Sequence, residues 1–214
     1  MTNAGRPVVR RWWWIAAALI VILAGAGWYA RSRLAPPPLQ GAVLTPSVGA
    51  YDFRLPDAEG RTVSLAALRG KVVVLTFLYA HCPDYCPLVA DQIAKVHAQL
   101  GPLGDKVAFV AVSVDPSGDT PEAVREFLRA HHVDGVLTYV RGTGAQLRPV
   151  WAHYFVASDG QDGISASHAA AVGVSHTTIV YVIDPQGQVR VFLPANFDAN
   201  DLLTDVRLLA RSAR

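Results

Sequence analysis

The chain contains two cysteines, Cys82 and Cys86, and both lie in one short segment, HCPDYCP at residues 81–87. If a helix begins near Pro83, the two sulfur atoms lie on the same side of its first turn. The unpaired N–H groups and positive dipole end of that turn are then expected to lower the pKa of both thiols. Such a thiolate pair suits dithiol–disulfide chemistry or the binding of a soft metal ion. A purely structural disulfide is a weaker interpretation, because closing so short a loop removes little entropy from the unfolded chain.

Alternating strand and helix patterns surround the cysteine segment and predict an α/β domain built around a central sheet. The residues directly before it, 72–77 (VVVLTF), are apolar and mostly β-branched, as in a buried central strand. Further strands are expected at residues 107–114, 136–140, 178–183 and 188–193, the last two forming a hairpin around the turn DPQG.

Helices are expected after the cysteines and between the later strands, because apolar residues recur there three or four positions apart. Their predicted core faces are Leu88, Val89, Ile93, Val96 and Leu100; Val124, Phe127 and Leu128; Leu147, Val150, Trp151, Tyr154 and Phe155; and Leu202, Leu203, Val206 and Leu209. Thr120 is predicted to cap the second of these helices, with Pro121 at its first position. Pro149 is expected to kink the third or to delay its start. Residues 157–173 show no period, which indicates a long surface loop.

A long apolar segment near the N-terminus, residues 12–30 (WWWIAAALIVILAGAGWYA), is flanked by arginines and predicts a transmembrane helix. A cleaved signal peptide is the alternative, but this run is longer than the usual apolar region of about 7 to 15 residues. The arginines favour the short N-terminus inside, so we expect a single-pass protein of a bacterial plasma membrane with its C-terminal domain in the periplasm. The predicted domains are a cytoplasmic N-terminus at 1–11, the anchor at 12–30, an extended proline-rich linker at 31–48 and the α/β domain at 49–214.

The charge pattern argues against nucleic acid as a partner. The net charge is only +2, and the 19 lysines and arginines are scattered rather than interleaved with aromatic residues. Hydrophobic residues make up 51% of the chain, and the apolar N-terminal segment explains part of that share. The membrane, reached through this segment, is therefore a better candidate than a polyanion.

Several motifs together resemble the SCO/SenC family of thioredoxin-like copper proteins, over roughly residues 48 to 210. The motifs are CPDYCP at 82–87, YDFRL at 51–55, GKVVV at 70–74, SVDP at 113–116, DTP at 119–121 and VSHTT at 174–178. The resemblance implies a thioredoxin-like fold, with a central mixed sheet flanked by helices and an N-terminal transmembrane helix.

The resemblance also implies one copper ion, Cu(I) or Cu(II), bound by Cys82, Cys86 and His176. Two soft thiolates and an imidazole suit copper, whereas a structural zinc site would normally have a fourth protein ligand. By itself, His176 would be taken for an ordinary structural residue. The chain departs from the family pattern at His81 and Ser175, which leaves open the groups that orient the His176 ring.

Solvated or structural roles are expected for three other histidines, with adventitious metal binding or a part in metal transfer as the alternative: His81, His153 and His168. Asp84 and Asp115 fit a role in shaping the site as well as they fit turn or cap roles.

The function implied by the resemblance is that of a metallochaperone for the dinuclear copper centre of cytochrome c oxidase, which delivers copper or keeps that centre's cysteines reduced. The implied partners are the copper-site subunit of the oxidase and other periplasmic copper or thiol-redox proteins. The alternative is an enzyme, a periplasmic thiol–disulfide reductase that cycles Cys82 and Cys86 without metal. Against it, three residues separate the cysteines where thioredoxin-type catalysis normally uses two. The cysteine arrangement is not that of peroxiredoxins, and copper sensing or copper defence stays open.

Overall fold

The computed structural model describes residues 8–34, 38–156 and 179–212. Two compact units make up the chain, Met1–Pro38 and Leu39–Arg214. The loop predicted at residues 157–173 lies outside the described residues.

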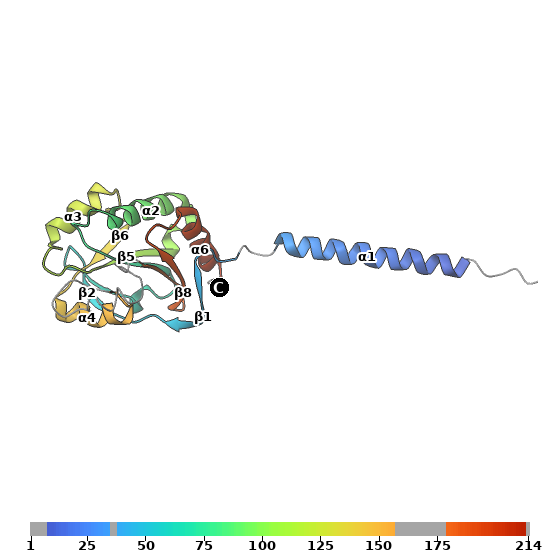
Figure 1. Cartoon of the computed structure of the whole chain (residues 1–214), viewed down its shortest axis with the longest axis horizontal. Coiled ribbons are helices and arrows are strands. Elements are labelled where there is room, and N and C mark those ends of the chain that lie inside the picture. The colour runs from blue at the N-terminus through green and yellow to red at the C-terminus, as the bar shows by residue number, and fades with distance from the viewer. Residues whose placement is uncertain (1–7, 35–37, 157–178, 213–214) are drawn as a thin grey trace, which may run out of the picture. The chain divides into compact units, whose positions relative to one another are not determined.

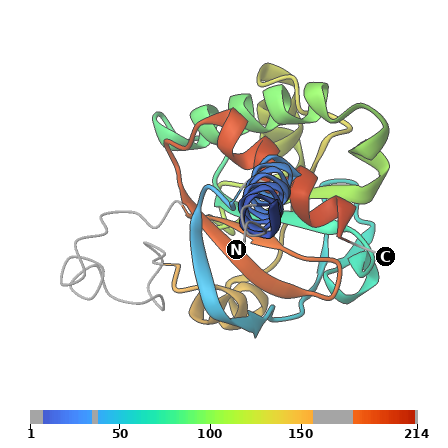
Figure 2. The same ribbon diagram turned by 90° about the vertical axis from the view of Figure 1, so that its right-hand side faces the viewer.

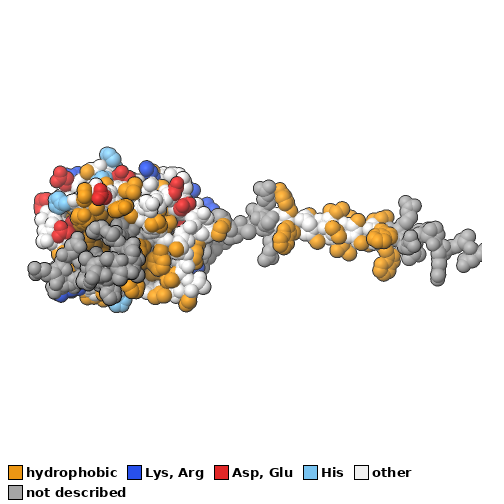
Figure 3. All heavy atoms as spheres, viewed as in Figure 1, with side chains coloured by type: hydrophobic (Ala, Val, Ile, Leu, Met, Phe, Trp, Pro, Cys, Tyr) orange, Lys and Arg blue, Asp and Glu red, His pale blue; other side chains and the backbone are white. Residues whose placement is uncertain are grey.

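The first unit contains one long helix, α1 (Val8–Leu34). Its segment Trp12–Tyr29 has a mean hydropathy of 1.6, and all of its side chains are exposed. Figure 3 shows apolar side chains following one another along this helix. Eighteen residues at about 1.5 Å each rise about 27 Å, close to the hydrocarbon thickness of a bilayer, about 30 Å. The predicted apolar N-terminal helix is therefore confirmed.

The second unit is built on a six-stranded mixed sheet with the strand order β1-β8-β7-β4-β5-β6. Its strands are β1 (Ala42–Gly49), β4 (Val72–Leu78), β5 (Val107–Ser113), β6 (Leu137–Val140), β7 (Ile179–Ile183) and β8 (Gln188–Pro194). Strands β4, β5 and β6 run parallel to one another, whereas β7 and β8 are antiparallel to their neighbours. A separate two-stranded sheet pairs β2 (Arg54–Pro56) with β3 (Thr62–Ser64).

Helices cover both faces of the large sheet (Figures 1 and 2). One face carries α2 (Tyr85–Leu100), α3 (Pro121–Ala130) and α6 (Ala199–Arg211), and the other carries α4 (Gly144–His153). The short 3₁₀ helix η1 (Ala66–Leu68) joins β3 to β4, and η2 (Gly101–Lys106) joins α2 to β5. Two hydrophobic cores result, one on each face. Successive residues of β4 alternate between the two cores, so all seven are buried. The predicted α/β architecture is confirmed.

Most of the predicted helix details are also confirmed. The Thr120 side chain accepts the Ala123 N–H at 3.2 Å, as expected of a cap. Pro149, however, does not delay α4, because a capping box around Thr143 already fixes the start of that helix.

Two predicted core positions are wrong, since Leu88 is 37% and Phe155 75% exposed. Phe155 comes after the C-cap residue Tyr154 of α4 and has a φ of 52°, in the left-handed region. The helical period therefore does not extend to Phe155.

The proline-rich linker is shorter than predicted. Strand β1 occupies residues 42–49 and pairs with β8. Before it, the Asp205 carboxylate on α6 accepts the N–H of Gln40 at 2.6 Å and that of Gly41 at 3.0 Å. The compact domain consequently begins at Leu39 rather than at residue 49. The sequence conceals this strand because its pairing partner lies about 140 to 150 residues later along the chain.

The substitution Asp205→Ala is expected to lower the free energy of unfolding by about 1–3 kcal/mol, because two backbone N–H groups lose their acceptor at a fully buried carboxylate. Urea denaturation of the full chain in detergent, followed by circular dichroism, measures the change. The exposed control Glu126→Ala should stay within about 0.5 kcal/mol of wild type. Equal stability of both variants would contradict the role given to Asp205.

Burial raises the pKa of Asp205, and hydrogen bonds from Gln40 and Gly41 offset only part of that rise. The folded pKa thus exceeds the unfolded one. The contribution of Asp205 to stability is then fully present below the unfolded pKa, about 3.9, and is lost as the pH rises through the folded pKa. Relative to Asp205→Asn, wild type should therefore gain unfolding free energy as the pH falls from neutral toward about 3.9, the ordinary pKa of an aspartate. A loss over the same range, measured by denaturation at both pH values, would show that the sign is wrong.

Candidate metal centre

Cys82 and Cys86 lie at the edge of the sheet where β4 ends. A turn leads from Tyr79 to Cys82 and is closed by the hydrogen bond from the Cys82 N–H to the Tyr79 carbonyl oxygen, at 3.2 Å. Helix α2 begins at Tyr85, so Cys86 lies in its first turn whereas Cys82 precedes the helix. The helix starts two residues later than predicted from Pro83, yet the fold brings the two cysteines together.

The Cys82 sulfur atom takes the place of a helix cap. It accepts the backbone N–H of Cys86 at 3.4 Å, one of the N–H groups that the first turn of a helix leaves unpaired. Within the described part of the chain, the side chain of Asp84 at the N-cap position makes no capping hydrogen bond. The Cys82 sulfur therefore lies in the positive field at the start of the 16-residue helix α2.

The two thiols differ electrostatically. Partial burial disfavours the Cys82 thiolate, but hydrogen bonds from the Cys86 side chain and from the N–H groups of Cys86 and Asp84 outweigh it, so the pKa of Cys82 is lowered. Cys86 is only 3% exposed, and burial raises the pKa of its thiol far above the ordinary value. The prediction that both pKa values are lowered is therefore wrong for Cys86. Its loss of hydration outweighs the effect of the helix start.

A buried carboxylate that the sequence analysis did not assign lies next to the cysteine turn. Asp119 is 1% exposed, and it accepts hydrogen bonds from the Ala80 N–H, the Ser113 hydroxyl and the Tyr139 hydroxyl. In the sequence it belongs to the segment DTP at 119–121 and precedes the helix cap Thr120, but neither feature marks it as a buried acceptor. Its three donors come from the ends of different strands, so no local pattern marks them.

Asp115, by contrast, has an ordinary turn role. One of its carboxylate oxygens, Oδ1, accepts the Gly118 N–H and the Ser117 hydroxyl, both at 2.9 Å. Such bonds stabilise the connection between β5 and α3 rather than the cysteine turn.

The histidines give the site no third ligand among the residues that the structure describes. His81 is exposed beside Cys82, and His153 stacks on the Tyr51 ring at a centroid distance of 3.8 Å. His168 and the predicted ligand His176 lie outside the described residues. In the described ranges, no three His, Cys, Asp or Glu side chains are grouped so that they could hold a metal ion. Two of the three predicted ligands are thus brought together, and the third stays a prediction.

The strand that follows His176 in the sequence begins at the edge where the cysteines lie. Strand β7 is antiparallel to β4, with Tyr181 opposite Leu75. Ile179, the first residue of β7, therefore lies toward the C-terminal end of β4. Strand β7 therefore begins at the end of the sheet where β4 ends and the cysteine turn begins.

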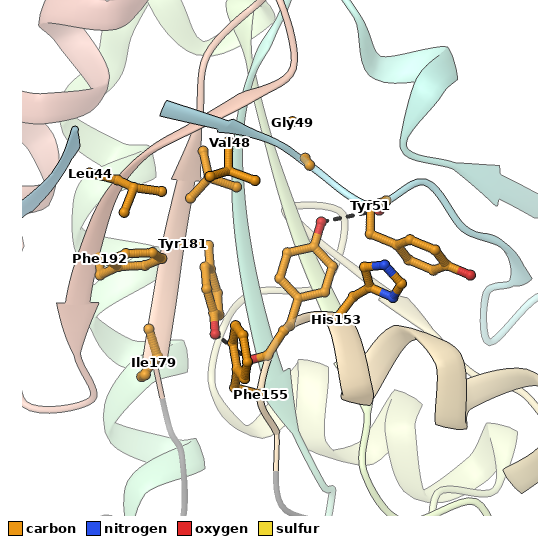
Figure 4. A pocket seen from close by; sticks show the side chains of 12 residues that line it. Leu44, Val48, Gly49, Tyr51, His153, Phe155, Ile179, Tyr181 and Phe192 are labelled. Atoms are coloured by element: carbon orange, nitrogen blue, oxygen red, sulfur yellow. Dashed lines mark hydrogen bonds between the residues drawn. The ribbon is translucent and has the colours of Figure 1, made fainter. Parts of the chain in front are cut away.

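An apolar pocket of about 500 Å³ lies between β1, β7, β8 and the end of α4 (Figure 4). Its buried hydroxyl groups are satisfied, since the Tyr154 hydroxyl donates to the Tyr51 carbonyl oxygen at 3.1 Å and the Tyr181 hydroxyl donates to the Tyr154 carbonyl oxygen. Phe155 and Ile179 also line the pocket, and neither cysteine does. The pocket is therefore not the predicted metal centre.

Comparison with known proteins identifies the family. The family model described as SCO1/SenC matches residues 44–211. The chain belongs to the SCO1/SenC family. It is 30% identical over 156 residues to "Protein SCO2, mitochondrial" of Saccharomyces cerevisiae, a match that covers 72% of this chain and 50% of that SCO protein. The human "Protein SCO2 homolog, mitochondrial" is 30% identical over 193 residues, covering 86% of this chain and 69% of the homolog. The chain thus spans only half the length of the yeast relative.

Solved structures of SCO proteins share the fold. Yeast Sco1 with copper bound is 25% identical, with a TM-score of 0.62, over 78% of this chain and 90% of that one. ScoI of Arabidopsis thaliana with copper bound is 27% identical, with a TM-score of 0.61, over 78% of this chain and 100% of that one. The predicted thioredoxin-like fold is confirmed. Another structural neighbour, BsSco, belongs to "the Sco family of cytochrome c oxidase assembly proteins".

Iodoacetamide is expected to alkylate Cys82 at least about tenfold faster than Cys86 in the reduced, metal-free protein near neutral pH, because only Cys82 is partly exposed with a lowered pKa. Mass spectrometry of the two labelled sites after short reaction times measures the ratio. In guanidinium the two rates should become similar, which is the control. Similar rates in the native protein would contradict the assigned asymmetry.

Proposed function

We propose that this SCO1/SenC protein is a copper metallochaperone, anchored in a bacterial plasma membrane with its thioredoxin-like domain on the periplasmic side. Its cargo is one copper ion, destined for the dinuclear copper centre in the copper-site subunit of cytochrome c oxidase. The observation that carries the proposal is the contact of the Cys82 sulfur with the first turn that holds Cys86, in a chain of this family. The copper-bound yeast and Arabidopsis structures support copper as the cargo.

The proposed ligands are Cys82, Cys86 and His176. Thiolate sulfur is a soft ligand that favours Cu(I), and imidazole accommodates both Cu(I) and Cu(II). The cysteine segment follows the C-terminal end of β4. Strand β7, which comes after His176 in the sequence, begins at the same end of the sheet. A structural zinc site would normally have a fourth protein ligand.

Transfer of the cargo is proposed to proceed by ligand exchange. An acceptor thiolate forms a bond to the metal as the bond to one donor sulfur breaks, so neither partner is oxidised or reduced. Cys82 is the donor sulfur that an acceptor reaches first, because it is partly exposed whereas Cys86 is buried. The lowered pKa of Cys82 also makes its thiolate a good leaving ligand.

Helix α1 supplies the proposed anchor. Its 18-residue apolar segment suits a single membrane span, and the flanking arginines favour a cytoplasmic N-terminus. Tethering the domain to the membrane that also holds the oxidase raises the effective concentration of donor at acceptor.

A thiol–disulfide reductase is the second candidate, and the asymmetry of the two thiols favours it. In that reaction the Cys82 thiolate attacks a substrate disulfide and forms a mixed disulfide, releasing one substrate thiol. The Cys86 sulfur, after losing its proton, then attacks Cys82 and releases the second thiol. The substrate gains two electrons and two protons, and a periplasmic dithiol protein must reduce the Cys82–Cys86 disulfide afterwards.

The two candidates are separated by the copper stoichiometry of the full chain in detergent. The metallochaperone is expected to bind one Cu(I) per chain and, with Cu(II), to show thiolate charge-transfer absorption. Each of Cys82→Ser, Cys86→Ser and His176→Ala should weaken Cu(I) binding at least about tenfold in competition with a chromogenic chelator. The matched control, His153→Ala, removes another histidine and should bind like wild type.

Binding that is unchanged in His176→Ala would remove that residue from the ligand set. Weak binding by wild type, together with a disulfide that cycles readily, would overturn the metallochaperone and favour the reductase.

A further inference from the structure

A buried carboxylate, that of Asp119, holds the cysteine turn through Ala80. Its Oδ1 accepts the N–H of Ala80, a residue inside the turn that ends at Cys82, at 2.7 Å. Its Oδ2 accepts the Ser113 hydroxyl at 2.5 Å and the Tyr139 hydroxyl at 2.9 Å. One side chain therefore joins the chain after β4 to the last residue of β5 and to β6.

Asp119 is itself held firmly in place. Its N–H donates to the Asp115 carbonyl oxygen at 2.9 Å, and its own carbonyl oxygen accepts the Arg141 side chain. The next residue, Thr120, caps α3. The carboxylate consequently offers a fixed acceptor to the turn.

We infer that Asp119 is the positioning residue of the cysteine turn, and that it sets the place of the Cys82 sulfur relative to Cys86. A single residue separates Ala80 from Cys82, and the turn is closed by the bond from Cys82 to the Tyr79 carbonyl oxygen. The Cys82 sulfur then meets the Cys86 N–H at 3.4 Å. Because Ala80 and Cys82 belong to the same closed turn, a displacement of Ala80 also displaces the Cys82 sulfur atom. The inference deepens the proposed function, since it names the residue that holds two of the proposed copper ligands in register.

Removing the carboxylate takes an acceptor away from three donors. The Ala80 N–H and two hydroxyl groups, those of Ser113 and Tyr139, then lose their acceptor beside a buried core, which is unfavourable. The residues that follow Cys82, Pro83 and Asp84, are exposed, so the turn has room to move outward. An outward shift separates the Cys82 sulfur from the start of α2 and uncovers Cys86.

The test compares Asp119→Ala, Asp119→Asn and Asp205→Ala in the full chain in detergent. Asparagine keeps the size of the side chain and an oxygen that accepts the Ala80 N–H. Its NH2 group then faces the Ser113 and Tyr139 hydroxyls, which can turn to accept from it, so asparagine should rescue the turn. Asp205→Ala is the matched control, because Asp205 is also buried and also accepts backbone N–H groups, but those of residues 40 and 41. It destabilises the domain without touching the cysteine turn.

Two readouts on the metal-free protein report the turn directly: deuterium uptake by residues 79–84, and the ratio of Cys82 to Cys86 alkylation by iodoacetamide. In Asp119→Ala, uptake should rise and the ratio should fall at least about fivefold, because Cys82 loses a stabilising contact as Cys86 becomes accessible. Asp119→Asn should stay within about twofold of wild type, as should Asp205→Ala. If Asp119→Ala matches Asp205→Ala in both readouts, or if Asp119→Asn fails as completely as Asp119→Ala, the inference is overturned.

Cu(I) affinity, measured against a chromogenic chelator, then relates the turn to the proposed function. If Cu(I) affinity falls at least about fivefold in Asp119→Ala but not in Asp205→Ala, the result supports both the role of Asp119 and the metallochaperone proposal. If wild type binds no copper, the metallochaperone proposal fails, while the alkylation ratio still decides the role of Asp119. If the turn moves in Asp119→Ala but Cu(I) affinity does not, the effect of Asp119 on the copper ligands is overturned.

Discussion

Strand β4 is buried on both faces and hydrogen-bonded on both edges, to β5 on one side and to β7 on the other. A strand enclosed in this way has little freedom to shift, because any slip would break two ladders and move apolar side chains between two packed cores. The end of β4 is therefore one of the best-fixed points of the domain. The cysteine turn begins directly after that point, so the start of the segment that carries the two sulfur atoms is fixed in place.

Beyond the end of the strand, the turn needs other support. The Tyr79 carbonyl oxygen closes it, Asp119 holds it through Ala80, and the first turn of α2 receives the Cys82 sulfur. Each of these contacts joins the turn to a different part of the domain. The turn is therefore well positioned although several of its residues are exposed. Such a combination suits a site that must meet a partner protein and still keep the geometry of its ligands.

The two sulfur atoms share one helix start but not one environment. The loop places Cys82 in partial contact with solvent, whereas the helix carries Cys86 into the core beside α2 and the sheet. Unequal burial gives one sulfur that an acceptor can reach and one that stays within the domain. The same inequality fits copper exchange and dithiol chemistry. The proposed third ligand, His176, rather than the cysteine pair, therefore separates the two proposed functions.

The sequence by itself determined the apolar N-terminal helix, the buried strand before the cysteines, the hairpin and the helical stripes, because each depends on periodicity within a short window. It also determined the family, since the motif CPDYCP and its flanking segments are local. Tertiary structure alone decided three other properties. Strand β1 exists because β8 pairs with it, the pKa of Cys86 is raised because the core excludes water from its sulfur, and Asp119 supports the turn because three strands end around it. These three features depend on burial and on pairing between distant segments, which no local sequence pattern predicts.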